Sequence, residues 1–394
     1  MLTTPRTLPS LNLPLQISPA KGSSRVRVLH VGKFYPPEHG GMESHVHELV
    51  SELRDSVEQS VVVASKTRQS SKETVDGIPV TRLGALLDFF GAPVCPSMIK
   101  AIRSADADIL HIHLPNPIAI MAYLASGFTG KLVFTYHSDI VRQKLLGSAF
   151  SAIQHRALNK SDAIIATSEN YLKTSHVLSA HLDRCHVIPL GIPLERFRYP
   201  DPHIVDWIRN QYGPSIVVAL GRLVRYKGFD HLLRAMTKVD GHLLLIGNGP
   251  LREELEELSR SLGIHDRVTI LSGVADVVPY YHAADVFVLP SINRSEAFGL
   301  VQLEAMACGK PVINTALNSG VPFVSRHDET GLTVAPSDED ALAGAITKLL
   351  REPDLRARLG AAAKVRAQTE FNVETMARRT LSLYESVLRG RKPA

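Results

Sequence analysis

Short apolar runs alternate with amphipathic helical stretches along most of the chain. The first apolar run, Val26 to Val31, is followed by Pro36 and Pro37, a glycine pair and the helical pattern MESHVHELVSEL. A strand, a loop and a helix in this order open a doubly wound α/β unit, and short apolar runs bounded by Gly, Pro or Asp are typical of parallel strands covered on both faces. The pattern therefore predicts a parallel sheet layered between helices.

The same alternation occurs in two series. Further strand-like runs are SVVVAS, ADILHIH, KLVFTYHSD, DAIIATSE and CHVIPLGI in the first series, and SIVVALGRL, HLLLIGNGP, VTILSG, VFVLPS and KPVINT in the second. Residues 192–213 are Pro-rich and charged and contain no strand-like run, so we interpret them as the linker. We expect two Rossmann-like halves facing a central cleft, with ligands at the carboxyl ends of the strands.

Length and composition agree with this organisation. A chain of 394 residues is too long for one ordinary core, and 44% hydrophobic with 21% charged residues is typical of a globular protein. We place the first domain at residues 25–200 and the second at 201–377. Residues 1–24 are rich in Pro and Ser and have no continuous apolar segment, which predicts a disordered leader rather than a signal peptide.

Charge and cysteine content exclude several classes of protein. The net charge of +5 favours, weakly, an anionic partner such as a phosphate-rich ligand or a membrane surface, and no basic run with interleaved aromatics indicates DNA binding. Cys95, Cys185 and Cys308 form no CxxC pair, so a zinc site or disulfide framework is not predicted and a reducing compartment is favoured. No apolar stretch approaches the ~20 residues that span a bilayer.

Two glycine pairs lie where a strand leads into a helix. Gly40 and Gly41 precede a helix and could cradle an anion, because free N–H groups and the helix dipole point the same way there; a simple helix-entry turn is the alternative. Gly247 and Gly249 resemble half of a dinucleotide fingerprint, but Arg252 occupies the third glycine position, so NAD binding is disfavoured. Glycine at these positions could still allow the backbone to approach a phosphate or base, or serve only a tight turn.

Charged side chains follow one strand of each half. Arg222 and Lys227 follow the first strand of the second half and suit a diphosphate, with a solvated charge run as the alternative. His137 and Asp139 follow a strand of the first half, where a histidine can donate to a phosphate or sugar hydroxyl or act as acid or base. His111 is interpreted as a core residue, and because no carboxylate lies at metal-ligand spacing from the histidines, no metal site is predicted.

Two carboxylates flank the apolar run FGLVQLEAMA. If residues 298–307 form a helix, Glu296 lies just before it and Glu304 near its middle, roughly 12 Å apart at most, which is too far for a catalytic dyad. The helix N-terminus near Phe298 and Gly299 would attract a phosphate between them. A nucleotide-diphosphate sugar, with hydroxyls at both ends, fits this arrangement. A cap at Glu296 and a solvated Glu304 fit poorly, since Glu304 is flanked by apolar residues.

Several motifs, in order, resemble one family. EAFGLVQLE is similar to the E-x7-E motif of the retaining GT4 glycosyltransferases with the GT-B fold. GRLVRYKGFD, LIGNGP, LEAMACGKPVI and ETGLTVAPSD stand where that family has second-domain motifs, and YPPEHGGMESHVHEL resembles its first-domain glycine loop. The resemblance covers the chain from about residue 25 onward. It implies that the last helix, residues 378–394, returns to the first domain.

The resemblance also implies roles for single residues. Glu296 would hold hydroxyls of the transferred sugar, and Glu304 the ribose. Arg222 and Lys227 would bind the diphosphate leaving group, and His137 would contact sugar or phosphate from the opposite domain. These implied catalytic residues are Glu296, His137, Arg222 and Lys227. The remaining candidate donor contacts are Gly40, Gly41, Gly247, Gly249, Val274, Phe298, Gly299 and Leu300.

The family's reaction retains the anomeric configuration and uses no metal or other cofactor. In place of the family's common Gly-Gly-x-x-Glu, this chain has NSGVPFV, with Phe323 instead of the acid. The segment resembles the bacterial mannosyl- and rhamnosyltransferases of O-antigen and polysaccharide synthesis, which implies GDP-mannose or a GDP-deoxymannose as donor. A UDP-sugar-dependent transferase (glucose or GlcNAc) and a nucleotide-sugar epimerase are the alternatives.

The acceptor, a glycan or lipid-linked sugar, is expected on the first domain. The segment LGALLDFFGAPVCP reads as a loop that exposes Leu86, Leu87, Phe89 and Phe90. A following helical stretch mixes apolar residues with Arg142, Lys144, Arg156 and Lys160. Such a surface suits anionic lipid headgroups, with an ordinary packing helix as the alternative. We therefore expect a cytoplasmic protein, with peripheral contact at the inner face of the membrane as a hypothesis.

Overall fold

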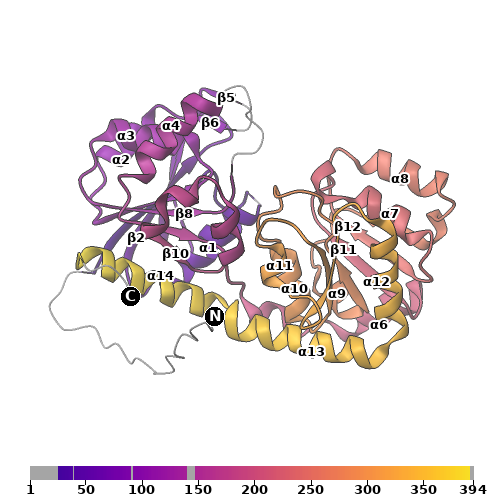
Figure 1. Ribbon diagram of the computed structural model, residues 1–394. Coiled ribbons are helices and arrows are strands. Elements are labelled where there is room, and N and C mark those ends of the chain that lie inside the picture. Colours follow the sequence, from indigo (N-terminus) through magenta and orange to yellow (C-terminus); the bar gives the residue numbers. More distant parts are fainter. Residues whose placement is uncertain (1–24, 39, 90–91, 140–146, 391–394) are drawn as a thin grey trace.

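The computed structural model describes residues 25–38, 40–89, 92–139 and 147–390. They form two α/β domains, and a pair of long helices at the end of the chain runs along both (Figure 1). The expected leader, residues 1–24, lies outside the described residues. Among the described helices, none is both long and apolar enough to cross a bilayer.

The first domain contains an eight-stranded sheet. Its strands are β1 (Arg27–Val31), β2 (Glu58–Ala64), β3 (Ser71–Val75), β4 (Ile78–Leu83), β7 (Ile109–Leu114), β8 (Lys131–Tyr136), β9 (Ala163–Ala166) and β10 (Cys185–Val187). Their order is β10-β9-β8-β7-β1-β2-β4-β3, and all pairs are parallel except β3 with β4. The helices are α1 (Gly41–Leu53), α2 (Ser97–Arg103), α3 (Pro117–Ser126), α4 (Gly147–Leu158) and α5 (Glu169–Thr174). The segment expected as an exposed loop forms a hairpin of β5 (Leu87–Phe89) and β6 (Ala92–Val94).

The second domain contains a six-stranded parallel sheet. Its strands are β11 (Ile216–Leu220), β12 (His242–Ile246), β13 (Val268–Leu271), β14 (Val286–Val288), β15 (Val312–Thr315) and β16 (Gly331–Val334), in the order β13-β12-β11-β14-β15-β16. Its helices are α6 (Pro202–Tyr212), α7 (Phe229–Met236), α8 (Arg252–Ser261), α9 (Val278–Ala283), α10 (Leu300–Ala307), α11 (Val321–Val324), α12 (Glu339–Arg351) and α13 (Pro353–Glu370). The predicted pair of Rossmann-like domains is confirmed.

The apolar run of β11 shows why its sequence forms a covered strand. Successive side chains of a strand point to opposite faces. Ile216 and Val218 therefore enter one hydrophobic cluster, with Tyr281 of α9, while Val217 and Ala219 enter another on the opposite face. A run without polar alternation is what a sheet with helices on both faces requires.

The end of the chain crosses from the second domain to the first. Helix α13 packs on α10, and the next helix, α14 (Val373–Leu388), packs on α1. Between them Ile192 donates its N–H to the carbonyl of Phe371 at 2.9 Å, so both crossings of the chain between the domains lie side by side. The helix begins at Val373, before the expected residue 378, because the Asn372 side chain accepts the Thr375 N–H and caps it there.

The segment 192–213 is more than a linker. Phe197 and Ile208 are fully buried in the core of the second domain, and α6 occupies residues 202–212. The second domain's core therefore begins upstream of the boundary expected at residue 201. The sequence pattern concealed this because the segment contributes a helix and isolated core residues instead of a strand.

Candidate functional site

The loops that follow the parallel strands of the two domains meet between them. His137 and Asp139 follow β8, and the loop with Glu296 follows β14. A Cβ on Gly41 would lie 3.7 Å from Leu300 Cδ1, so the glycine loop before α1 faces the start of α10 across the domain boundary. The candidate site therefore lies where both sheets present their carboxyl ends, as ligand sites of this fold class do.

Lys227 and Glu296 form a buried ion pair at the centre of this site. Lys227 Nζ lies 2.6 Å from Glu296 Oε2, and each residue is 7% exposed. Ser291 donates its hydroxyl to the same carboxylate oxygen at 3.0 Å. Burial alone lowers the pKa of Lys227, but the Glu296 carboxylate outweighs it, and the net shift is upward. Two residues assigned to different parts of a ligand therefore stabilise each other.

Glycine makes room for the lysine side chain. Lys227 ends a short 3₁₀ turn, η3 (Arg225–Lys227), and a Cβ on Gly221 would lie 3.1 Å from Lys227 Nζ. Arg222, next to Gly221, is exposed, and no ion pair joins it to another described residue. The site therefore contains a buried lysine that is paired with a carboxylate and an exposed arginine that is accessible to an anionic ligand.

Glu304 is held by a residue that the sequence did not indicate. Tyr281 of α9 donates its hydroxyl to Glu304 Oε2 at 2.7 Å. Burial raises the pKa of Glu304 and, together with the Glu304 charge, raises the pKa of Tyr281 well above its usual range. One carboxylate oxygen is thus fixed by the phenol, which orients the other oxygen for a second hydrogen-bond partner.

The start of α10 requires glycine. Gly299 has a φ of 75° and caps the helix, and a Cβ there would lie 2.6 Å from Leu289 Cδ2. The backbone N–H groups of the first turn have no partner within a helix and can receive an anion. The Phe298 side chain is buried, with its ring centre 6.1 Å from that of Phe371, and therefore belongs to the core of the domain.

The other candidate glycines have packing reasons as well. A Cβ on Gly247 would lie 1.9 Å from the Gly221 carbonyl oxygen, and one on Gly249 would lie 2.4 Å from that of Leu223. These glycines therefore allow the β12 loop to pack against the β11 loop, which favours the tight-turn interpretation. Val274 lies in the loop before α9 and is partly buried against the domain core.

Five buried histidines lie beneath the site in the first domain. Their ring contacts join His30, His45, His111, His113 and His137. His111 and His113 stack at 4.3 Å, because residues two apart on a strand share a face. Burial lowers the pKa of every one of them, to about 3 for His30 and to about 4 for His45. These imidazoles are therefore neutral at physiological pH.

Two histidine trios have nitrogen atoms close enough to be considered as metal ligands. They are His30, His111 and His113, and His45, His113 and His137, with ligand atoms within 4.8 Å of one another. Both ring nitrogens of His111 are already used, by Tyr384 at 2.6 Å and Thr135 at 2.7 Å. His113 belongs to both trios and contacts His30 at 3.3 Å. We retain the prediction that the site uses no metal.

An ion pair between the two domains, Asp139 with Arg294, was not part of the predicted site. Asp139, noted only as a neighbour of His137, pairs with Arg294, which immediately precedes the SEAFG segment. Tertiary proximity, and no sequence spacing, brings these two residues together.

Comparisons with known proteins agree with the fold and motifs. Residues 39–196 match the family described as Glycosyltransferase Family 4, and residues 208–366 match Glycosyl transferases group 1. The chain is 31% identical to the D-rhamnosyltransferase WbpZ of Pseudomonas aeruginosa over 352 residues, 88% of this chain and 92% of that protein. The chain belongs to the family 4 glycosyltransferases. The expected family is thereby confirmed.

Two further similarities extend over nearly the whole glycosyltransferase. It is 30% identical, over 89% of its length and 96% of the relative, to the GDP-mannose-dependent alpha-(1-6)-phosphatidylinositol monomannoside mannosyltransferase of Mycobacterium tuberculosis. Among solved structures, sucrose-phosphate synthase from Thermosynechococcus elongatus superposes with a TM-score of 0.78 at 26% identity, covering 93% of this chain and all of that chain. The GT-B architecture is the shared feature.

Proposed function

We propose that this glycosyltransferase moves mannose or a deoxymannose, with retention, from a GDP-linked donor to a hydroxyl of a glycan or lipid-linked sugar. The observation that carries the proposal is the buried Lys227–Glu296 pair beside the N-terminus of α10. A carboxylate paired with a lysine next to anion-binding N–H groups fits a ligand whose sugar hydroxyls adjoin a phosphate.

The donor would extend along the second domain. Arg222 and the first turn of α10 bind the diphosphate, with Lys227 reaching it from the ion pair. Glu296 accepts hydrogen bonds from the sugar, and Glu304, oriented by Tyr281, accepts them from the ribose. Gly41 and His137 complete the site from the first domain.

The transfer step follows from this placement of charge. The acceptor oxygen attacks the anomeric carbon from the face that the diphosphate leaves, forming the new glycosidic bond as the bond to the phosphate oxygen breaks. The acceptor's proton passes to that phosphate oxygen, so the step needs no protein base. Arg222, Lys227 and the helix N-terminus stabilise the negative charge that develops on the leaving diphosphate.

The choice of donor is supported by relatives and by Phe323. Of the two relatives described above, one is a D-rhamnosyltransferase and the other a GDP-mannose-dependent mannosyltransferase. Phe323, where many family members have an acid, packs its ring 5.9 Å from that of Phe371 and 5.7 Å from the Arg366 guanidinium. An apolar side chain at this position supports a donor site with two carboxylates, Glu296 and Glu304, and no third one. UDP-linked glucose or GlcNAc remains the alternative donor.

The acceptor side would contact the inner face of the cytoplasmic membrane. Leu86 and Leu87, at the β5–β6 hairpin, are 57% and 54% exposed, and Arg156 and Lys160 at the end of α4 are exposed. Phe90, Arg142 and Lys144 lie outside the described residues. Apolar and basic side chains on one domain suit an anionic lipid surface that carries the acceptor.

Transfer with a defined donor tests the proposal. The purified protein is incubated with GDP-α-mannose and a panel of mannose- and rhamnose-ended acceptors, and the product's anomeric configuration is read by NMR. An α-linked product supports a retaining mannosyltransferase. A β-linked product, or transfer from UDP-sugars alone, would overturn the mechanism or the donor respectively.

A further inference from the structure

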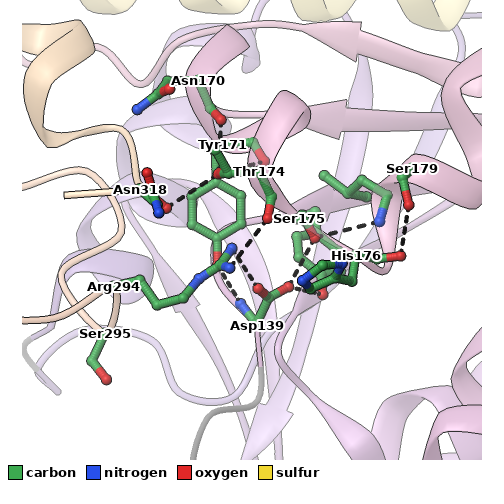
Figure 2. A network of polar contacts seen from close by, with 12 residues as sticks. Asp139, Asn170, Tyr171, Thr174, Ser175, His176, Ser179, Arg294, Ser295 and Asn318 are labelled. Carbon is green, nitrogen blue, oxygen red and sulfur yellow. Dashed lines mark hydrogen bonds and ion pairs between the residues drawn. The ribbon is translucent and has the colours of Figure 1, made fainter.

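Arg294 of the second domain pairs with Asp139 of the first (Figure 2). Arg294 Nη2 lies 2.6 Å from Asp139 Oδ2, and the two side chains are 26% and 19% exposed. The guanidinium lies 5.2 Å from the centre of the Tyr171 ring, and Nη1 donates to the Thr174 carbonyl at 3.2 Å. Among ion pairs between described residues, this one alone joins the two domains.

Asp139 is oriented by hydrogen bonds within its own domain, independently of Arg294. Its Oδ1 accepts the hydroxyls of Tyr136 at 2.7 Å and Ser175 at 3.0 Å. Its N–H donates to the Tyr171 hydroxyl at 2.6 Å. Oδ2 is therefore the oxygen that faces the second domain, and a charge held in one orientation loses little entropy when it pairs.

Arg294 lies in the same hydrogen-bonded turn as Glu296. The Ser295 N–H donates to Asn293 Oδ1 at 2.9 Å, and the Glu296 N–H donates to the Asn293 carbonyl at 3.1 Å. These hydrogen bonds place Arg294 and Glu296 in one turn. Asp139 likewise stands two residues after His137, so the ion pair links the two segments that carry a proposed sugar contact from each domain.

Neutral contacts also join the two domains close to these segments, and Ala297, next to Glu296, packs against the core of the first domain. Asn170 Nδ2 donates to the Ser319 carbonyl at 2.5 Å, and Thr174 Oγ1 donates to the Asn318 carbonyl at 3.1 Å. They dock α5 on the loop before α11. The same loop donates the Gly320 N–H to the carbonyl of Ala297 at 2.6 Å, and the Arg294 guanidinium adds the charged contact to this docking.

We propose that Arg294 is a positioning residue for transfer, which sets the distance between the His137 and Glu296 segments by pairing with Asp139. This inference rests on the proposed function. Most contacts of the nucleotide would come from the second domain, whereas the reacting sugar needs both domains. Removal of the cation would therefore reduce the population of the aligned arrangement and lower kcat, while nucleotide affinity stays unchanged.

The test compares Arg294→Met and Arg294→Lys with the wild-type protein. We expect Arg294→Met to lower kcat at least about tenfold, with the Kd of the nucleoside diphosphate within about twofold. Arg294→Lys keeps the charge and should recover part of the loss. Arg326→Met is the matched control, because Arg326 forms an exposed pair with Glu329 at 3.3 Å inside the second domain and should leave kcat unchanged.

Asp139→Asn supplies an independent measurement. If the two residues act as one unit, the double variant Asp139→Asn/Arg294→Met should have a kcat no lower than the worse single variant. Additive losses, or a wild-type kcat in folded Arg294→Met, would overturn the inference. Failure of the wild-type protein to bind any nucleoside diphosphate or to transfer sugar would instead overturn the proposed function, so the two failures are distinguishable.

Discussion

Lys227 Nζ lies 2.6 Å from Glu296 Oε2, and this ion pair is buried in the loops that follow β11 and β14. Each charge is the principal compensation for the other, since a buried charge without a partner is unstable. The relationship gives the two residues a joint structural role in addition to any contact with a ligand, and functional tests must separate the two.

Glu296→Ala should lower the rate of sugar transfer much more than the affinity for the nucleoside diphosphate. Glu296 is proposed to contact the transferred sugar, so its loss should lower kcat about a hundredfold or more. The Kd of the nucleoside diphosphate, which lacks that sugar, should stay within about threefold. Steady-state kinetics and calorimetry on one preparation measure both. Lys227→Ala should lower kcat and also raise the Kd of the nucleoside diphosphate. If the two substitutions had equally small effects on transfer, the assigned roles would be contradicted.

The same pair predicts a recovery of stability in a double variant. Lys227→Met leaves the Glu296 carboxylate buried and unpaired and should cost about 3–5 kcal/mol of unfolding free energy. Adding Glu296→Gln removes that charge and should restore part of the loss. Urea unfolding monitored by circular dichroism measures these free energies. A double variant less stable than Lys227→Met would show that the pair is not the source.

Tyr281→Phe should weaken nucleotide binding without unfolding the protein. The variant removes the hydroxyl that orients Glu304 and leaves the ring in its core position. Loss of a hydrogen bond to a charged group corresponds to roughly a tenfold increase in the Kd of GDP. Tyr199→Phe is the control, since Tyr199 is 75% exposed. Unchanged affinity in Tyr281→Phe would contradict the ribose role of Glu304.

The buried histidines predict loss of stability in mild acid. Their pKa values in the folded protein lie below the value in the unfolded chain, near 3 for His30 and 4 for His45. Between the folded and the unfolded pKa, the unfolded chain therefore binds more protons than the folded protein. Stability is therefore complete above about pH 6.5 and falls below it, by up to about 1.4 kcal/mol per pH unit for each histidine.

Urea unfolding at several pH values between 5 and 8 checks this slope. His45→Gln should reduce the slope, whereas substitution of the exposed His327 should leave it unchanged. A stability that does not change from pH 7.5 to 5.5 would contradict the neutral state of the histidines.

Chelation should leave transfer intact. The positive charge proposed to stabilise the leaving diphosphate comes from Arg222, Lys227 and a helix N-terminus, so activity after EDTA treatment and dialysis should stay within about twofold. Activity lost on chelation and restored by a divalent cation would show that one of the histidine trios, or the donor itself, requires a metal.

The sequence predicted the strands that are long apolar runs and missed shorter or mixed ones, among them β3, β4 and β16. Strand β11 is an unbroken apolar run, which only a covered parallel strand requires. Strand β3 has the sequence SKETV and is exposed along most of its length, so its pairing with β4 decides its conformation. Strand β16 is only four residues long, too short for a clear pattern, and its pairing with β15 decides its conformation.

The candidate site shows the same division. Lys227, Glu296 and Glu304 were found because their charges interrupt apolar or glycine-rich runs. Their partners, Ser291 and Tyr281, carry no such signal, because a hydroxyl is common in any loop or helix. Contacts between residues distant in the chain depend on the domain packing, which local patterns do not encode.

The most direct measurement is calorimetric titration of the wild-type protein with GDP, GDP-mannose, UDP and UDP-glucose. The proposed donor cleft predicts that GDP and GDP-mannose bind at least about tenfold more tightly than the uridine ligands. Preference for uridine ligands would contradict the donor assignment alone. Absence of binding by every nucleotide, in folded protein, would contradict the proposal that Glu296 and Glu304 hold a nucleotide-diphosphate sugar.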